Sequence, residues 1–257
     1  MIVPADDRGL LLGDGLFETL LAVDGRLTDF DAHARRLDRG CAVLGLPAPG
    51  DDQLWQAAEA ALETAGLGQG RAAVRLTWTA GSGGRGLDRP EPPFPRLFAA
   101  AAAAPPAPAG PARLATAGVR RNADSPASRL KTLAYLDNVL ARREAVAAGA
   151  DEAVMLNTRG EVACAAAGNL FWFEGERLVT PALACGVLDG VVRGRVLAAA
   201  RSMGMDVEEA AAGPARLAAA TGVFLTNSLV GLRRGSRLDG RVVEPAPGLA
   251  ALEAALT

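Results

Sequence analysis

Lysine occurs once in this sequence, at Lys131, among 27 lysine and arginine residues. A guanidinium stays protonated inside a protein, whereas a lysine amine can be desolvated to its neutral form and can condense with an aldehyde. Leu130, Leu133, Leu136 and Leu140 are spaced for one apolar helix face, which predicts that Lys131 stands in the first turn of a helix with one buried side. The plainer interpretation is a chance lysine on a solvated face, because most lysines are exposed.

The composition limits the classes of partner and metal. The net charge is −2 and no block of like charges occurs, which argues against a nucleic-acid or membrane surface and favours a small-molecule substrate. The single histidine and the three cysteines lack the spacing of a metal site or a disulfide framework, so we expect no metal. Asp6, Asp7 and Arg8 precede a short apolar run that is typical of neither a signal peptide nor a spanning segment, so we expect a cytoplasmic protein.

The first half of the chain predicts two strands, two helices and a glycine-rich loop. Residues 16–23 predict a strand that runs into the tight turn Asp24-Gly25. Apolar residues at helical spacing predict helices over 31–44 and 51–65. The alternating strand 73–79 opens into a loop, 81–86, in which four glycines would let the backbone approach a ligand closely. Flexible filler is the alternative for such a loop.

A segment rich in alanine and proline divides the chain. Pro105, Pro106, Pro108 and Pro111 follow a run of alanines, a composition that suits an extended connector. We therefore predict a small N-terminal α/β domain of residues 1–106, a linker of residues 107–112 and a C-terminal domain of residues 113–257. Propensity leaves open whether the alanine run is helix or strand.

The second half predicts an antiparallel sheet and a helix opened by glycines. Strands and tight turns alternate between residues 152 and 181, which is typical of antiparallel pairing. Gly186 and Gly190 precede a helix that extends to about Met203, and the free N–H groups and dipole at its start favour an anion. A later strand ends in the polar residues Thr226-Asn227-Ser228.

These features together fit pyridoxal 5'-phosphate (PLP) as cofactor. An amine suits its aldehyde, and a helix start, hydroxyl groups and an arginine suit its phosphate. Arg36, close to the only histidine, supplies that arginine. Neither a Walker loop nor a Gly-x-Ser-x-Gly motif occurs, and no metal or serine mechanism uses as many of these residues.

Six ordered motifs between about Asp7 and Gly231 make the sequence resemble the class IV (fold type IV) PLP enzymes. That family includes branched-chain and D-amino-acid aminotransferases and aminodeoxychorismate lyase. The motifs that carry the resemblance are Gly13–Glu18, His33–Leu37, Lys131–Asn138, Gly168–Phe171, Thr180–Pro181 and Gly186–Arg193.

The resemblance implies a fold and a set of cofactor ligands. The fold would be α+β or α/β, with two domains as in D-amino-acid aminotransferase and the cofactor between them. Lys131 would be the Schiff-base lysine and proton carrier, and Arg36 would bind the cofactor phosphate. The backbone N–H groups of Val191 and Val192 and the side chains of Thr226 and Asn227 would complete the phosphate site. The resemblance also implies a homodimer in which the glycine-rich loop reaches a neighbouring active site.

One residue departs from the family pattern. Five residues before the Asn of the Asn-Leu-Phe motif the family has a glutamate that pairs with the pyridine nitrogen, and here that position is Cys164. A neutral thiol supplies no charge, so the cofactor ring would be a poorer electron sink. This loss should penalise transamination more than an elimination that forms an aromatic ring.

The subgroup follows from the substrate loops. Residues 79–86 and 226–231 resemble those of aminodeoxychorismate lyases, which makes Arg85 a candidate for a substrate carboxylate. Phe17 stands where D-amino-acid aminotransferase has a tyrosine that helps hold the substrate, and Asn227 is a further candidate contact. We therefore expect a 4-amino-4-deoxychorismate lyase acting on a small amine substrate, with a D-amino-acid or branched-chain aminotransferase as the alternative. A PLP-binding homologue with weak or lost turnover is the second alternative, because of Cys164.

Overall fold

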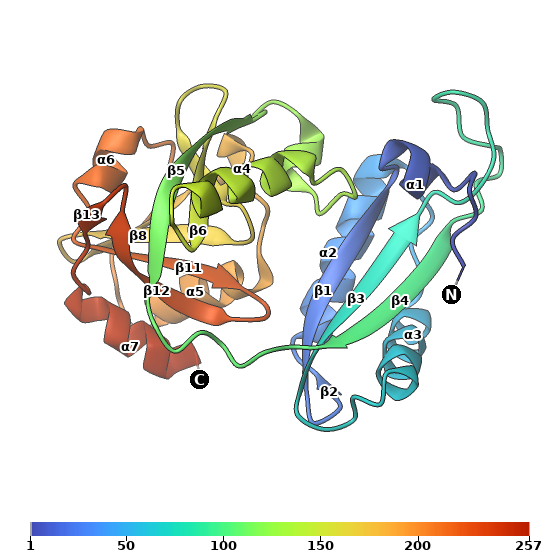
Figure 1. The fold of residues 1–257 in the computed structure, drawn as a ribbon, viewed down its shortest axis with the longest axis horizontal. Helices are drawn as coiled ribbons and strands as arrows, with labels where there is room; N and C mark the ends of the chain where they lie inside the picture. The colour runs from blue at the N-terminus through green and yellow to red at the C-terminus, as the bar shows by residue number, and fades with distance from the viewer. Residues whose placement is uncertain (1, 257) are drawn as a thin grey trace. The chain divides into compact units, whose positions relative to one another are not determined.

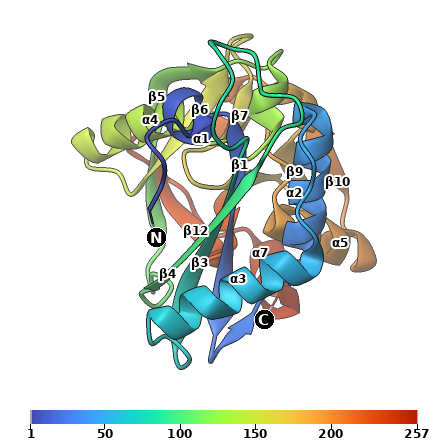
Figure 2. The same cartoon turned by 90° about the vertical axis from the view of Figure 1, so that its right-hand side faces the viewer.

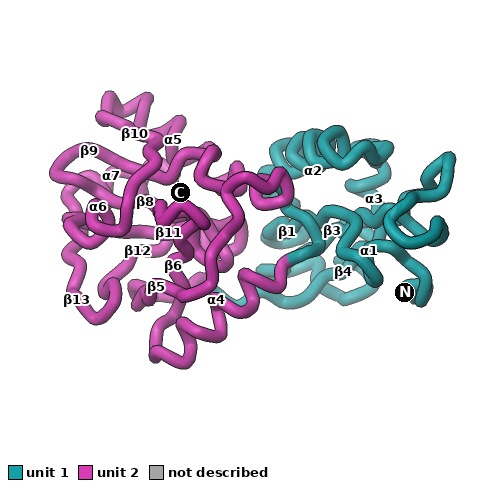
Figure 3. Tube along the Cα trace, turned by 90° about the horizontal axis from the view of Figure 1, so that it is seen from above, with its two compact units in different colours: residues 1–106, 130–134 teal, residues 107–129, 135–257 magenta. Residues whose placement is uncertain are grey.

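The computed structural model describes residues 2–256 and divides into two compact units. Unit 1 comprises Met1–Pro106 and Leu130–Ala134, and unit 2 comprises Ala107–Arg129 and Tyr135–Thr257 (Figures 1 and 3). The short segment that carries Lys131 therefore belongs to unit 1, although more than twenty residues of unit 2 precede it in the chain. The predicted division into two consecutive domains and a linker stays a prediction. It did not include the return of residues 130–134 to unit 1.

Unit 1 is an antiparallel sheet covered on one face by helices. Its elements in chain order are α1 (Arg8–Leu12), β1 (Gly15–Val23), β2 (Arg26–Leu27), α2 (Phe30–Leu44), α3 (Asp51–Thr64), β3 (Arg71–Thr79) and β4 (Arg96–Ala103). Among the described residues the strands run in the order β2-β1-β3-β4, and α2 and α3 lie against one face (Figure 2). This confirms the strands and helices predicted before residue 80.

Alternation in β1 and β3 decides which side chains meet the helices. Leu16 and Leu20 of β1 join Val74 and Leu76 of β3 in the core beneath α2 and α3. Because side chains alternate along a strand, the intervening residues point to the opposite face. The alanine run, left open between helix and strand, is strand β4, since pairing with β3 along its whole length outweighs alanine's helix propensity.

Lys131 does not stand in a helix, so that prediction was wrong. The Phe17 amide donates to the Lys131 carbonyl (2.9 Å) and the Leu133 amide donates to the Gly15 carbonyl (3.0 Å), so this segment lies antiparallel to the start of β1. The following helix, α4 (Leu136–Ala147), begins only five residues after Lys131. Its Leu136 is exposed, and Asn138, Ala141 and Ala145 make its buried side, so the leucine spacing did not mark a buried face.

Unit 2 is a larger mixed sheet with helices packed on it. Besides α4 its elements are β5 (Ala112–Arg121), η1 (Pro126–Arg129), β6 (Glu152–Asn157), β7 (Val162–Ala165), β8 (Asn169–Glu174), β9 (Arg177–Pro181), η2 (Leu183–Cys185), α5 (Val191–Ser202), β10 (Val207–Ala210), α6 (Pro214–Ala218), β11 (Gly222–Asn227), β12 (Gly231–Leu238), β13 (Arg241–Val242) and α7 (Pro247–Leu256). Within residues 2–256 the strand order is β10-β9-β8-β11-β12-β5-β6-β7, with β13 beside β12.

The antiparallel pairing predicted between residues 152 and 181 is confirmed, because β6 pairs antiparallel with β7 and β8 with β9. The later strands β11 and β12 continue this pairing next to β8. Strand β5 pairs parallel with both β6 and β12, and β9 pairs parallel with β10. Parallel neighbours need a long crossover, which α4 supplies between β5 and β6 and α5 supplies between β9 and β10. The face of β8 and β11 that carries Phe171, Phe173 and Phe224 packs on α5 and α7.

Candidate active site

The Lys131 amine contacts Phe17 on the face of the unit 1 sheet opposite α2 and α3. Its Nζ is 4.2 Å from the centre of the Phe17 ring, and the guanidinium carbon of Arg75 is 3.7 Å from the same centre. Phe17 sits on β1 and Arg75 on the neighbouring strand β3, both at positions that point away from the helices. The structure therefore places the predicted substrate residue Phe17 in contact with the lysine.

Arg75 is a residue that the sequence analysis missed. It is exposed, and Phe17 brings its guanidinium into the same small region as the only lysine. Its Nε donates to the Thr77 hydroxyl (3.3 Å), and a guanidinium stacked on an aromatic ring can also bind a planar carboxylate. The signal was present in the sequence as a charged residue on the non-core face of a strand, but its partner could be identified only from the register of β1 and β3.

A buried carboxylate on β1, Glu18, binds the side chains of His33 and Arg36 on α2. Glu18 accepts hydrogen bonds from Arg36 Nε (2.8 Å) and Nη2 (2.5 Å), and its Oε2 is 2.7 Å from His33 Nδ1. His33 and Arg36 are one helical turn apart and face β1 together. Burial alone would raise the pKa of Glu18, but the hydrogen bonds and charge of Arg36, aided by His33, lower it below its usual value. Glu18 is therefore an anion that fixes Arg36.

This environment makes Lys131 a weaker base than an ordinary lysine. Burial is the main cause that lowers the pKa of Lys131, to about 8, with the positive charges of Arg36 and Arg75 acting in the same direction. The Glu18 carboxylate opposes them and limits the shift. A lysine with this pKa has a substantial neutral fraction near neutral pH, as a nucleophilic amine requires.

The start of α5 in unit 2 is where the sequence predicts an anion site. Gly190 is the N-cap residue and offers no side-chain hydrogen bond, so the N–H groups of Val191 and Val192 lack an acceptor within the helix. Asn169 lies beside this turn and donates to the Leu188 carbonyl (2.8 Å). Thr226 pairs with Asn169 across β8 and β11, so both side chains lie on the α5 face of the sheet.

Two observations at this site fit a phosphate. Thr226 is 2% exposed, and its buried hydroxyl has no hydrogen-bond partner among the described residues. A Cβ on Gly190 would lie only 2.0 Å from Asn169 Oδ1, so only glycine allows this close turn. An orphaned hydroxyl beside an uncapped helix start is the arrangement that a bound anion would satisfy. The residues present therefore fit the phosphate of PLP.

The remaining predicted residues of unit 2 have described partners. The Asn227 side chain donates to the Ala167 carbonyl (3.1 Å) and accepts from the amides of Leu229 and Val230, so it shapes the loop after β11. Cys164 lies on β7, opposite Met155, and is buried. Burial raises the pKa of the Cys164 thiol, although the charge of Arg121 acts in the opposite direction. Cys164 is therefore neutral at neutral pH.

Arg121 connects the segments around Cys164. Its guanidinium donates to the carbonyls of Gly186 (2.9 Å) and Ser128 (2.5 Å) and to the Asn138 side chain (3.2 Å). Asn138 in turn donates to the Ala166 carbonyl (2.7 Å). This buried guanidinium thus fixes the loop that follows β5 and the turn that precedes α5.

Arg85, the candidate for a substrate carboxylate, lies in the glycine-rich loop of unit 1 and is exposed. Its side chain makes no hydrogen bond to any of residues 2–256, whereas its backbone forms a bridge to Asp88. The side chain is therefore available to a ligand. Within the described part of the chain no helix is both long and apolar enough to cross a membrane.

The fold defines the class of protein to which this chain belongs. Residues 15–238 match the family model for amino-transferase class IV. The chain belongs to this family, and its fold is that of the fold type IV aminotransferases, which confirms the resemblance inferred from the motifs.

Individual relatives carry both of the expected activities in their names. A protein from Methanocaldococcus jannaschii, provisionally named a branched-chain-amino-acid aminotransferase, is 32% identical over 240 residues, which cover 92% of this chain and 83% of that protein. The aminodeoxychorismate lyase of Bacillus subtilis is 28% identical over 230 residues, covering 87% of this chain and 77% of the lyase. The chain is also similar to the solved PLP-bound form of a hypothetical aminotransferase from Mycobacterium tuberculosis, with a TM-score of 0.86, 26% identity and coverage of 100% and 94%.

Proposed function

We propose that this chain is a PLP-dependent 4-amino-4-deoxychorismate lyase, which releases pyruvate and leaves 4-aminobenzoate, in cytoplasmic folate biosynthesis. The observation that carries the proposal is the only lysine, whose amine has a pKa of about 8 beside an aromatic ring and an exposed arginine. The PLP-bound relative supports the same cofactor.

The proposal assigns the two ends of the cofactor to residues already described. Lys131 would hold its aldehyde carbon, and the N–H groups of Val191 and Val192 with the Thr226 hydroxyl would hold its phosphate. Arg36 and Asn227 remain proposed further contacts. Bound PLP supplies an aldehyde that condenses with amines and a ring that accepts electrons from the carbon next to the substrate nitrogen.

The chain's own residues would move the proton and hold the substrate. The neutral Nζ of Lys131 accepts the proton from the substrate carbon that bears the nitrogen. The electron pair left behind completes the aromatic ring as the bond to the enolpyruvyl oxygen breaks. Protonation of the leaving group at its methylene carbon then gives pyruvate. Arg75 and Arg85 are the proposed partners of the two substrate carboxylates, because a guanidinium binds a carboxylate through two parallel hydrogen bonds.

Cys164 favours the lyase over a transaminase. At the position where the family has a glutamate, this chain has a neutral buried thiol, so the ring nitrogen would lack an anionic partner. Transamination needs the ring to hold the electron pair until a proton returns to the cofactor. In the elimination the electron pair can instead enter the substrate ring, which becomes aromatic as the carbon–oxygen bond breaks.

A transaminase acting on D-amino or branched-chain amino acids is the second candidate, and the Methanocaldococcus jannaschii relative favours it. Cys164 also motivates a third candidate, a PLP-binding homologue with weak or lost turnover. We further propose a homodimer, as the resemblance implies, since large apolar side chains are exposed within unit 1 at Leu10, Leu11, Leu12, Leu87 and Phe94 and within unit 2 at Leu136, Val139 and Val146.

The first test is pyruvate release by the purified, PLP-loaded protein given 4-amino-4-deoxychorismate. We expect pyruvate from the parent and none from Lys131→Ala, and borohydride should attach the cofactor to the parent at its single lysine only. Thr226→Val removes a hydroxyl that has no hydrogen-bond partner within residues 2–256, so we expect unchanged or slightly higher stability but about ten-fold weaker PLP binding, the worth of one hydrogen bond to a charged group.

Each alternative has its own outcome. A protein that borohydride labels but that makes no pyruvate excludes the lyase, and amino transfer from D- or branched-chain amino acids would then identify the transaminase. Labelling without consumption of any amine substrate would indicate lost turnover. Equal PLP affinity of Thr226→Val and the parent would show that Thr226 does not bind the phosphate.

A further inference from the structure

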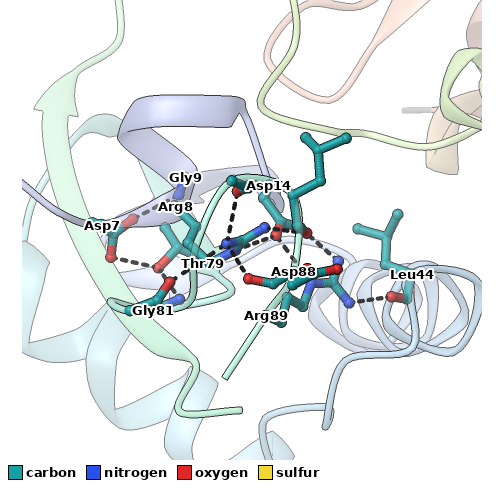
Figure 4. A network of polar contacts seen from close by, with 12 residues as sticks. Asp7, Arg8, Gly9, Asp14, Leu44, Thr79, Gly81, Asp88 and Arg89 are labelled. Carbon is teal, nitrogen blue, oxygen red and sulfur yellow. Dashed lines mark hydrogen bonds and ion pairs between the residues drawn. The ribbon is translucent and has the colours of Figure 1, made fainter. Parts of the chain in front are cut away.

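One buried guanidinium organises the whole glycine-rich loop of unit 1. Arg8, the first residue of α1, is only 4% exposed. Its Nη2 donates to the Leu87 carbonyl (2.8 Å) and its Nη1 to the Asp88 carbonyl (2.9 Å), with longer contacts of 3.4 Å from Nη1 to the carbonyls of Gly83 and Gly86. The loop backbone therefore curls around this side chain, with its carbonyls turned inward (Figure 4).

The charge of Arg8 is balanced by a carboxylate that also holds the end of the loop. Arg8 Nε donates to Asp14 Oδ2 (2.9 Å), and Arg89 donates to both oxygens of Asp14 (2.6 and 3.0 Å). Arg89 also donates to the Leu44 carbonyl at the end of α2 (2.5 Å). One carboxylate between two guanidinium groups thus ties α1, the start of β1 and the far end of the loop together.

The near end of the loop is fixed by the residues around Arg8. The Arg8 amide donates to the Gly81 carbonyl (2.8 Å). Asp7, which is fully buried, accepts from the Gly9 amide and from the Thr79 hydroxyl (2.8 Å each). Both ends and the middle of the loop therefore depend on the segment of residues 7–14, which lies far away in sequence (Figure 4).

The packing around Arg8 requires glycine at one position of the loop and leaves space for a Cβ at another. Gly84 has φ +79°, and a Cβ there would lie 2.1 Å from the Asp88 carbonyl oxygen and 3.0 Å from Arg8 Nη1. Gly86 has a similar φ of +61°, but a Cβ there would meet nothing within 4 Å. Both glycines thus have the left-handed conformation, but only at Gly84 would a Cβ collide with the loop and approach Arg8.

We propose that Arg8 is a positioning residue: by holding the carbonyls of residues 83, 86, 87 and 88, it fixes the loop in the conformation that presents Arg85 to a substrate carboxylate. Arg8 itself touches no substrate, because its donors are occupied by the loop and by Asp14. The inference rests on the proposed function, since it gives a role to the arginine that the loop presents. Loss of Arg8 should weaken substrate binding and leave the chemistry at Lys131 intact.

The loop itself is tested by limited trypsin digestion, which needs no activity. Arg8→Lys keeps the charge but replaces a planar five-donor group with a compact ammonium, so we expect cleavage after Arg85 to be about ten-fold faster. Arg96→Lys is the matched control, because Arg96 is exposed at the start of β4 and its side chain has no described hydrogen bond. Mass spectrometry of the N-terminal fragment identifies the cleavage site among the many arginines.

The positioning role is tested by steady-state pyruvate release. We expect Arg8→Lys and Gly84→Ala to raise KM for 4-amino-4-deoxychorismate about ten-fold while kcat changes by less than about three-fold, the pattern of lost uniform binding. Gly86→Ala, with the same backbone strain but no clash, should keep a KM close to that of the parent. A change in kcat alone would contradict the proposal.

The results separate this proposal from the proposed function. Equal cleavage of Arg8→Lys and Arg96→Lys would overturn the holding role of Arg8, whatever the enzyme does. Faster cleavage with an unchanged KM would overturn the positioning role and leave a structural anchor. A protein that releases no pyruvate refutes the proposed lyase together with the positioning role, whereas the digestion still decides whether Arg8 holds the loop.

Discussion

At the scale of single residues, the chemistry of this chain depends on charges that surround one amine. Lys131 is lowered in basicity by burial and by two arginines, and a single carboxylate, Glu18, opposes them. Glu18 in turn is ionised because Arg36 and His33 hold it. The two members of the Glu18–Arg36 ion pair therefore act on the pKa of Lys131 in opposite directions: Glu18 raises it and Arg36 lowers it.

Titration of the single lysine tests this balance. Labelling of Lys131 by an amine-reactive reagent, followed by mass spectrometry, should rise with pH around a midpoint of about 8, because only the neutral amine reacts. Glu18→Gln removes a charge that raises the lysine pKa, so its midpoint should fall below that of the parent. Arg36→Gln removes a charge that lowers it, so its midpoint should rise.

Glu63→Gln serves as the control, since Glu63 is an exposed residue of α3 and should leave the midpoint unchanged. Shifts of Glu18→Gln and Arg36→Gln in the same direction would show that lost folding, and not lost charge, controls the label.

At the scale of elements, α5 combines a turn that needs glycine with a helix that does not. Gly190 is packed against Asn169, whereas Gly194, one turn into the helix, has open space where a Cβ would be. Alanine at position 190 would collide with Asn169, whereas alanine at position 194 would only reduce the backbone entropy of the unfolded chain.

Alanine substitutions in α5 should therefore have opposite effects on stability. Gly194→Ala should raise the free energy of unfolding by about 0.5–1 kcal/mol, the difference in helix propensity. Gly190→Ala should lower it by about 1–3 kcal/mol, the usual cost of overpacking, and should also weaken PLP binding because the first turn moves. Urea unfolding of the two variants and the parent measures both values, and equal effects would contradict the role of the Gly190–Asn169 contact.

At the scale of the whole molecule, exposed apolar side chains require an explanation. Soluble chains seldom expose several large apolar residues close together unless a partner covers them. On α4, Leu136, Val139 and Val146 are exposed at helical spacing. A second copy of the chain is the proposed partner.

The homodimer is tested by light scattering after size-exclusion chromatography. We expect the parent to have about twice the chain mass of 26.3 kDa. Val139→Glu should shift the protein toward the monomer, because an unpaired charge in an interface is costly. Val242→Glu, on the exposed strand β13, is the matched control and should leave the mass unchanged. A monomeric parent, or equal behaviour of the two variants, would refute α4 as the interface.

The sequence by itself determined the elements with clear periodicity and the residue types that chemistry needs. Alternation predicted β1 and β3, helical spacing predicted α2 and α3, and glycines marked the start of α5. Lys131 stood out by residue type alone. These inferences succeeded because burial of one face imposes a period on neighbouring residues, which a single sequence displays.

Only the tertiary structure decided which distant residues meet. It put Lys131 beside β1 instead of in a helix, bound Glu18 to Arg36, and set Arg75 against Phe17. It also wrapped the glycine-rich loop around Arg8. Local spacing carries no information on such partners, because hydrogen bonds and ion pairs between separate strands, helices and loops depend on strand register and chain return, which only packing of the whole unit fixes.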